Sequence, residues 1–349
     1  MDTKETADLL DFAPEALRER FKKEGIEAYR ADQVLDWVYG KGVYRFDRMT
    51  NLPIALRERL ALAFRLEMPV VAERQRSDGD ESTKLLLKLN DKDHVETVLM
   101  RVKDRRTVCV SSQVGCKFHC AFCASGQDGF FRNLRQSEIV SQVLLARDAA
   151  PDKKLTHIVF MGIGEPFDNY TELMKTIRTL NSKQGLGMGA RKITISTCGI
   201  IPKIEALAKE GLQVELSVSL HGPNDIVRGA VMPVNRAFPV HDLIDACKRY
   251  SKATKRAITF EYILISGVNA SEKEAHELGR LLRGMLCKVN LIPYNPIEEF
   301  PHDQPNYESI VRFQKALQSH GTKTTVRFSK GRDIQAACGQ LRSVALHKK

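Results

Sequence analysis

Three of the eight cysteines fall within one octapeptide, Cys116-Lys-Phe-His-Cys120-Ala-Phe-Cys123. Thiolates are the preferred ligands of iron–sulfur clusters, and three of them can hold three irons of a cubane while the fourth iron stays open to a substrate. The alternative is a zinc site, but zinc spacing usually pairs one Cys-x-x-Cys with a second, distant pair. The sequence contains no second Cys-x-x-Cys and no His-x-x-x-His. We therefore expect Cys116, Cys120 and Cys123 to hold a metal cluster.

Polar residues follow the ends of four other predicted strands. The first group, Met161-Gly-Ile-Gly164-Glu165-Pro166, has glycines that let a ligand approach the backbone and a carboxylate that can accept hydrogen bonds from an ammonium group. The other groups are Ser196, the tripeptide Ser219-Leu220-His221, and Asn295. Each of these is a routine turn residue when taken alone, but strand ends that meet at one mouth predict a shared ligand site.

These residues lie on a repeated pattern of strand, loop and helix that begins near residue 106. The candidate strands are 107–112, 156–161, 192–197, 213–219, 257–265, 288–292 and 324–328, and the candidate helices are 136–149, 169–182, 201–210, 239–251, 271–285 and 306–320. Such alternation predicts an α/β fold with a parallel sheet, here about six units of an incomplete β/α barrel. In barrels of this kind the chemistry takes place at the C-terminal ends of the strands.

The residues before this repeat have a different pattern. Amphipathic helices are predicted over 13–25, 28–41 and 53–66, and short strands over 69–71, 83–89 and 95–102, with a turn at 90–93. We expect a small accessory domain over residues 1–92, made of helices and then short strands. The core domain, with a C-terminal cysteine loop, is expected over residues 93–349.

The composition favours an anionic partner. The 54 basic and 43 acidic side chains give a net charge of +11, which is typical of proteins that bind nucleic acid, although a solvated basic surface is the alternative. The segment from Met1 to Phe12 lacks the basic and apolar regions of a signal peptide, and no run approaches about 18 apolar residues. We expect a cytoplasmic protein without membrane association, whose clustered cysteines bind metal in a reducing compartment.

Two further cysteines, Cys109 and Cys338, stand apart from the cluster loop. A lone cysteine is usually a small buried hydrophobe, which is our expectation for Cys198, Cys247 and Cys287. Cys338 instead lies among small residues in a segment of weak periodicity. That setting is typical of a mobile loop that carries a nucleophile to a site.

Taken in order, these motifs resemble the RlmN/Cfr family of radical S-adenosylmethionine (SAM) RNA adenine methyltransferases. The spacing Cys-x-x-x-Cys-x-x-Cys is similar to the signature of the whole radical SAM superfamily. The narrower resemblance rests on Glu96-Thr-Val, Cys109-Val-Ser-Ser-Gln-Val-Gly-Cys116, Met161-Gly-Ile-Gly-Glu-Pro166, Ser219-Leu-His, Pro293-Tyr-Asn-Pro296 and Ala337-Cys-Gly-Gln-Leu341. It runs from about residue 15 to 342. Small departures are Ser125 before Gly126, Cys198 before Gly199 and Gly222 after His221.

The resemblance implies a set of roles for these residues. One 4Fe–4S cluster would be held by Cys116, Cys120 and Cys123, and SAM, used twice per turnover, would be bound by Gly164, Glu165, Ser196, Ser219, Leu220, His221 and Asn295. Cys338 would be methylated by the first SAM, and its methyl carbon would add to adenine after a radical from the second SAM removes a hydrogen. Cys109 would then resolve the protein–RNA adduct and leave a Cys109–Cys338 disulfide. Glu96 would accept a proton.

The resemblance also implies the substrate and partners. The targets would be C2 of adenosine 2503 in 23S rRNA and adenosine 37 of certain tRNAs, with an external electron donor such as flavodoxin, and we expect a monomer. The motifs look more like this C2-methylating RlmN branch than the C8-methylating branch that confers antibiotic resistance. A radical SAM modifier of a protein or small molecule is also compatible with the motifs, and so is a non-catalytic zinc-dependent RNA-binding protein.

RNA contacts are expected from basic and aromatic residues around the predicted mouth and from the accessory domain. Interleaved Phe and Arg side chains can stack on unpaired bases while they neutralise phosphates. The candidates are Arg101, Lys103, Arg105, Arg106, Phe130, Phe131, Arg132, Arg135, Arg191, Lys192, Lys330, Arg332 and Arg342.

Overall fold

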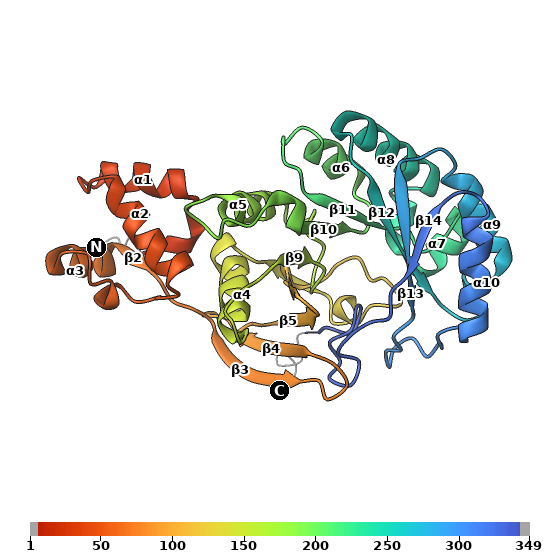
Figure 1. Cartoon of the computed structure of the whole chain (residues 1–349), viewed down its shortest axis with the longest axis horizontal. Coiled ribbons are helices and arrows are strands. Elements are labelled where there is room, and N and C mark those ends of the chain that lie inside the picture. Colours follow the sequence, from red (N-terminus) through yellow and green to blue (C-terminus); the bar gives the residue numbers. More distant parts are fainter. Residues whose placement is uncertain (1–5, 343–349) are drawn as a thin grey trace.

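One ten-stranded sheet runs through the molecule (Figure 1). The computed structural model describes residues 6–342. In their order across the sheet, the strands are β14 (Lys323–Val326), β13 (Cys287–Pro293), β12 (Ile258–Leu264), β11 (Glu215–Ser219), β10 (Ile193–Thr197), β9 (His157–Phe160), β6 (Arg105–Cys109), β5 (His94–Val102), β4 (Ser82–Lys88) and β3 (Val70–Arg76). Neighbours from β14 to β6 pair in parallel, and neighbours from β6 to β3 pair antiparallel.

Helices connect and cover the parallel strands. They are α4 (Gln136–Ala149), α5 (Tyr170–Asn181), α6 (Ile201–Leu207), α7 (Asp225–Val231), α8 (Val240–Thr254), α9 (Glu272–Leu281) and α10 (Tyr307–Gln318). Every residue of β12 is buried, as is typical of parallel strands that are covered on both faces. Within residues 6–342 the sheet has edges at β14 and β3 that do not pair with each other. The predicted incomplete β/α barrel is therefore confirmed.

The N-terminal helices form a separate small body beside the barrel (Figure 1). They are α1 (Pro14–Lys23), α2 (Tyr29–Leu35), which continues as a π-helical turn over Asp36–Gly40, and α3 (Ile54–Ala63). Two-residue strands β1 (Ala7–Asp8) and β2 (Phe64–Arg65) pair in parallel beside them. Their apolar side chains have their own cluster, which also takes in Val140 and Leu144 of α4.

The short strands that follow these helices belong to the main sheet. The strand expected at 69–71 extends to Arg76 as β3, and β4 pairs along its whole length with β5. The domain boundary expected at residue 92 therefore falls inside the β4–β5 hairpin, and backbone hydrogen bonds join the expected accessory strands to the core. No helix in the described residues is both long and apolar enough to cross a membrane.

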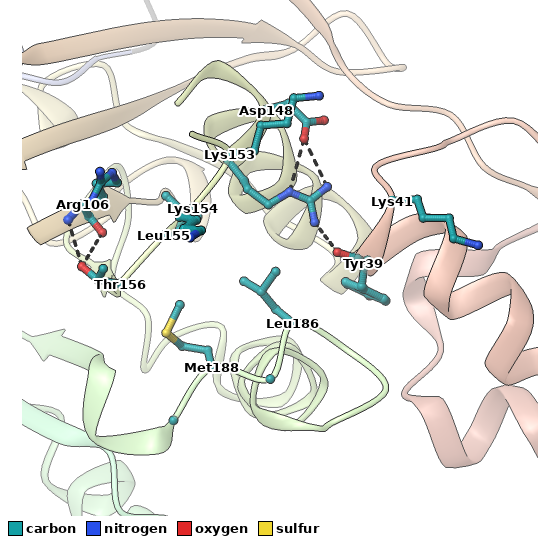
Figure 2. A pocket seen from close by; sticks show the side chains of 14 residues that line it. Tyr39, Lys41, Arg106, Asp148, Lys153, Lys154, Leu155, Thr156, Leu186 and Met188 are labelled. Carbon is teal, nitrogen blue, oxygen red and sulfur yellow. Dashed lines mark hydrogen bonds and ion pairs between the residues drawn. The ribbon is translucent and has the colours of Figure 1, made fainter. Parts of the chain in front are cut away.

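Polar contacts fix the helical body onto the barrel around a cavity at their junction (Figure 2). Arg147, near the end of α4, donates to the carbonyl oxygen of Tyr39 and lies 3.1 Å from a carboxylate oxygen of Asp148. Tyr44 Oη donates to the other Asp148 oxygen at 2.6 Å. Because Arg147 is buried, these contacts satisfy a charge that would otherwise be costly at this junction.

Candidate active site

The predicted cluster loop lies inside a small hairpin that the sequence pattern did not indicate. Strand β7 (Gln113–Gly115) pairs antiparallel with β8 (Phe130–Asn133), and the three cysteines lie on the connection between them. Gly115 has φ +74°, and a Cβ atom there would lie 2.0 Å from the carbonyl oxygen of Gly129. Cys116 N donates to that same carbonyl oxygen at 2.8 Å. Glycine at position 115 therefore lets the chain enter the loop.

The three thiols face one cavity, which we call the cysteine cavity. Cys116, Cys120 and Cys123 all line it, together with residues that follow β9, β10 and β11. Burial raises the pKa of Cys116 to about 12 and also raises the pKa values of Cys120 and Cys123. These thiols are protonated at neutral pH until a positive centre displaces the protons, which is the usual coupling of metal binding to thiol ionisation.

The thiols suit a cluster better than a single ion. Within residues 6–342 no three His, Cys, Asp or Glu side chains converge closely enough to hold one metal ion. A cubane cluster bonds each thiolate to a different iron, so its ligands surround the cluster instead of meeting at one point. Three thiols around one cavity fit that requirement.

The glycines after β9 let the chain pass close to the cluster loop. A Cβ atom on Gly162 would lie 2.7 Å from the carbonyl oxygen of Val110, and one on Gly164, where φ is +101°, would lie 2.6 Å from Gln113 Cβ. The backbone therefore passes against the segment that leads into the cysteine loop. Both glycines line the cysteine cavity.

Glu165 is buried at the wall of the cysteine cavity. Its two carboxylate oxygens accept hydrogen bonds from the backbone N–H groups of Cys198, at 2.7 Å, and Phe167, at 2.9 Å. Burial raises the pKa of Glu165, and these hydrogen bonds oppose that rise. The carboxylate keeps a fixed orientation and has lone pairs left for a ligand's ammonium group.

The structure brings some of the other predicted SAM contacts to the cavity but not all. Ser196, Ser219 and His221 line it. His221 is buried, and its Nδ1 accepts from Ile263 N at 3.0 Å, which fixes the ring as a neutral acceptor. Leu220 does not line it, because its side chain packs in the core and its N–H donates to the carbonyl oxygen of Glu261.

Asn295 also lies outside the cavity lining, in contact with the C-terminal segment. Its Nδ2 donates to Ser329 Oγ at 2.8 Å and to the carbonyl oxygen of Cys338 at 3.1 Å. The structure thus shows Asn295 in contact with the backbone of the residue expected to act as the nucleophile. A SAM contact from Asn295 stays a prediction.

The C-terminal segment carries Cys338 into the cysteine cavity. Two contacts dock the segment on the cluster loop: Ala124 N donates to the carbonyl oxygen of Gly339 at 2.7 Å, and Ser125 Oγ donates to that of Leu341 at 2.6 Å. The sequence pattern predicts a mobile loop here, and the structure shows a docked one. Ser125, which departs from the family pattern, is one of its anchors.

Cys109 lies behind this segment, in the apolar cluster that contains Ala336 and Leu341. Burial raises the pKa of Cys109 to about 12, and the charge of Cys338 is the next contributor to that rise. Both thiols are free, and the apolar cluster around Cys109 includes Ala336 and Leu341, which flank Cys338 in the sequence. This agrees with a paired role, while the disulfide stays a prediction.

Glu96 is buried on β5, but it faces a different cavity from the cluster cysteines. One carboxylate oxygen lies 3.0 Å from Lys84 Nζ, and the other accepts from the backbone N–H of Arg342 at 2.9 Å. Burial raises the pKa of Glu96, and the charge of Lys84 opposes that rise. Glu96 thus holds the end of the cysteine segment in this arrangement.

Two residues at the floor of the cysteine cavity were not found from the sequence. Glu261, on β12, and Arg327, after β14, both line it. Glu261 Oε1 accepts from Ser217 Oγ at 3.0 Å, while its Oε2 is buried without a hydrogen-bond partner. The acidic residue inside the apolar run of β12 could have indicated a functional role from the sequence. Only the strand register, however, shows that Glu261 faces the inside of the barrel.

Comparisons with known proteins agree with this geometry. The sequence model of the Radical SAM superfamily matches residues 110–279, and that of the ribosomal RNA large subunit methyltransferase N-terminal domain matches residues 7–66. The chain is 46% identical over 334 residues to a probable dual-specificity RNA methyltransferase RlmN of Thermoanaerobacter sp. (strain X514), with 96% of this chain and 97% of that one covered. It is 44% identical over 337 residues to a protein of the same name from Fervidobacterium nodosum, with 96% and 97% covered.

A solved structure is similar over almost the whole chain. The crystal structure of a radical SAM methyltransferase from Sphaerobacter thermophilus is 47% identical and superposes with a TM-score of 0.94. The match covers 97% of this chain and 99% of that chain. The likeness therefore includes the helical body, the barrel and the cysteine segment alike.

Proposed function

Because this chain belongs to the RlmN family of radical SAM RNA methyltransferases, we propose that it methylates C2 of adenosine 2503 in 23S rRNA and adenosine 37 of certain tRNAs. The observation that carries the proposal is the arrival of Cys338, from the far end of the chain, in the cavity that the cluster-loop cysteines line. The name dual-specificity, which the relatives bear, supports two kinds of RNA substrate.

The family works with a 4Fe–4S cluster and with SAM, two molecules of which are used per turnover. The residues present fit both groups: three thiols surround one cavity, and Glu165 and the glycines beside it form the adjoining wall. When bound, the cluster supplies the electron for reductive cleavage of SAM. We assign the cluster to Cys116, Cys120 and Cys123, and the methionine end of SAM to Gly164 and Glu165.

The protein side chains solve a polarity problem. The methyl group of SAM is electrophilic, and C2 of adenine is electron-poor, so direct transfer between them is mismatched. Cys338 can accept the methyl group by ordinary displacement and then present it to the base as a carbon bound to sulfur. We propose that Cys109, which shares an apolar cluster with residues on both sides of Cys338, attacks the Cys338 sulfur. The bond from that sulfur to the transferred carbon then breaks, the carbon takes a proton, and a Cys109–Cys338 disulfide forms. Glu96 is the proposed proton acceptor, and reaching the base requires a change in its contact with Arg342.

The remaining roles follow from the substrate. We propose that the N-terminal helical body binds RNA, that a flavodoxin-like protein supplies electrons, and that the enzyme acts as a monomer in the cytoplasm, where its RNA substrates are. The assignment to the RlmN family leaves a zinc-dependent RNA-binding role without support. Methylation at C8 instead of C2 is an outcome of the test below.

The test incubates cluster-loaded protein with reductant, methyl-labelled SAM and either 23S rRNA fragments or tRNA, followed by nucleoside chromatography and mass spectrometry. We expect labelled 2-methyladenosine from the wild type and none from Cys338→Ala. Cys287→Ala, which changes a half-buried thiol outside the cysteine cavity, is the matched control and should keep the activity. Co-elution with 8-methyladenosine would reassign the regiochemistry, and label on a ribose or an exocyclic nitrogen would contradict the proposal.

A further inference from the structure

A second cavity opens inside the barrel, next to the cysteine cavity. It has a volume of about 510 Å³ and is lined by side chains of β5, β6 and β9 to β13, many of them in the first halves of the parallel strands, and we call it the N-terminal lumen. Arg327, Phe328 and Lys330, which follow β14, complete its lining. Met161, Glu261 and Arg327 line both cavities. The two spaces therefore meet at the floor on which Glu261 and Arg327 lie.

The N-terminal lumen has an excess of positive charge. It holds two carboxylates: Glu215 pairs with Arg256, and Glu261 accepts from Ser217 and Asn290 through Oε1 alone. Five cations line the same space, namely Arg105, Arg191, Lys288, Arg327 and Lys330. Arg191 is bound to the neutral side chain of Gln213, and the other four form no ion pair within residues 6–342.

Like charges face each other in this lumen. Partial burial lowers the pKa of Arg105, and the charge of Arg327 lowers it further. Burial also lowers the pKa of His157, on the same wall, to about 4, so this imidazole is neutral at physiological pH. The charges of Arg327 and Lys288 act on Glu261, but the cations outnumber the acidic side chains in this partly enclosed space, an arrangement that an anionic ligand stabilises.

Several other cations, by contrast, are paired with acidic side chains of the protein. In the junction cavity of Figure 2, Arg106 lies 2.6 Å from Asp152, and Arg147 is held by Asp148 and Tyr39. Beyond that cavity, Arg101, Arg132 and Arg342 are paired with Glu81, with Asp91, Asp93 and Glu138, and with Glu299. Those cations are already neutralised by the protein itself, unlike Arg105, Lys288, Arg327 and Lys330 of the N-terminal lumen.

An aromatic side chain indicates the kind of anion. Phe328 lines the N-terminal lumen and is 53% exposed, which is unusual for so large an apolar group. An exposed ring beside unpaired cations is how proteins bind single-stranded nucleic acid, by stacking on bases while neutralising phosphates. Modification of a base in folded RNA also requires the nucleotide to leave its stack and enter the enzyme.

We propose that the N-terminal lumen binds the sugar–phosphate backbone on either side of the extruded target nucleotide, with Arg105, Arg327 and Lys330 as phosphate ligands. This inference rests on the proposed function and specifies where its RNA substrate binds. The base passes over the shared floor toward Cys338, while the flanking phosphates stay among the cations.

The test measures the affinity of an RNA hairpin with an unpaired loop adenosine, by fluorescence anisotropy over a range of salt concentrations. Arg105→Gln, Arg327→Gln and Lys330→Gln each remove one proposed phosphate contact. We expect each to weaken binding about tenfold and to reduce the slope of log Kd against log salt concentration by about 1. Arg283→Gln is the matched control, because Arg283 is exposed beyond α9 without an ion pair in the described residues, and it should bind as the wild type does.

The outcomes separate this inference from the proposed function. Wild-type affinity and salt slope in all three variants, with a wild-type enzyme that methylates RNA, would overturn the lumen assignment alone. A wild-type protein that neither binds nor methylates RNA would overturn both. Variants that bind RNA normally but whose cluster is no longer reduced by flavodoxin would show that the lumen binds the acidic electron donor instead of RNA, which also contradicts the proposal. If Arg327→Gln does not fold, the other two variants decide, because Arg105 and Lys330 do not line the cysteine cavity.

Discussion

The ion pair between Lys84 and Glu96 predicts how firmly the cysteine segment is held. The two side chains are 10% and 5% exposed and lie 3.0 Å apart, and Glu96 also accepts from Arg342 N at the end of the segment. Lys84→Met removes the cation and leaves the carboxylate buried. Breaking a buried pair from one side costs about 3–5 kcal/mol. Because Glu96 lines a cavity that admits water, we expect the low end of that range for Lys84→Met.

The pH dependence of this loss has a definite sign. Burial already raises the pKa of Glu96 in the wild type, and Lys84 opposes that rise, so Lys84→Met raises the pKa further. A carboxyl group whose pKa is raised by folding favours the folded state at low pH and loses that contribution as pH rises through the folded value. The loss of free energy of unfolding in Lys84→Met should therefore be large at pH 8 and become smaller toward pH 5.

The assay combines chemical denaturation with hydrogen exchange of the peptide that contains residues 335–342. We expect a lower free energy of unfolding for Lys84→Met and at least tenfold faster exchange in that peptide at pH 8. Lys88→Met, which changes an exposed lysine on the same strand, should leave both measurements unchanged. Replacing both partners, as Lys84→Met with Glu96→Gln, should recover most of the loss, because no uncompensated charge remains. Wild-type exchange in the single variant, or a deficit that does not vary with pH, would refute the reasoning.

Two further predictions concern the SAM wall and the N-terminal body. Gly164→Ala places a Cβ atom 2.6 Å from Gln113 Cβ at a residue with φ +101°. We therefore expect SAM binding to the cluster-loaded protein, measured by equilibrium dialysis, to fall at least tenfold. Gly79→Ala is the control and should not change SAM binding, because no atom lies closer than 3.9 Å to a Cβ atom there. Burial raises the pKa of Asp8 from 3.8 to about 6, so the ionised carboxylate opposes folding above that pH. Asp8→Asn removes the charge but keeps a cap acceptor for Leu10 N. It should raise the free energy of unfolding by about 3 kcal/mol at pH 8 and by little at pH 4. An equal gain in stability at both pH values would contradict this account.

Much of the fold follows from sequence periodicity, and the exceptions have physical reasons. Helix α4 was predicted over residues 136–149, which are the bounds that the structure shows. Helix α7 was missed: it has only seven residues, includes Gly229, and depends on Asn224, whose side chain accepts from Val227 N at the N-cap. The β7–β8 hairpin was also missed, because strands of three and four residues give too short a pattern.

The site was predicted where chemistry is concentrated in a few neighbouring residues and missed where it depends on strand register. The cysteine triplet and the Gly-Glu motif are local, and both line the cavity as expected. Glu261 and Arg327 come together only after β12 and β14 have paired on either side of β13. Leu220 differs from its neighbours Ser219 and His221, which face the cavity, because its own side chain faces the core, and its expected SAM contact stays a prediction.

The anchors of the cysteine segment restrict how Cys338 can move between its partners. Asp333 before the thiol accepts from Ser77 Oγ at 2.8 Å, and Arg342 after it is held by Glu96. At Cys338 itself, the described contact is the hydrogen bond from Asn295 to its carbonyl oxygen. In the proposed reaction the Cys338 thiol meets SAM, then a base, then Cys109, so it has to point in different directions without moving far. Because the carbonyl oxygen of Gly339 also accepts from Ala124 N at 2.7 Å, the backbone on both sides of Cys338 is held, and reorientation in the proposed reaction falls to the Cys338 side chain.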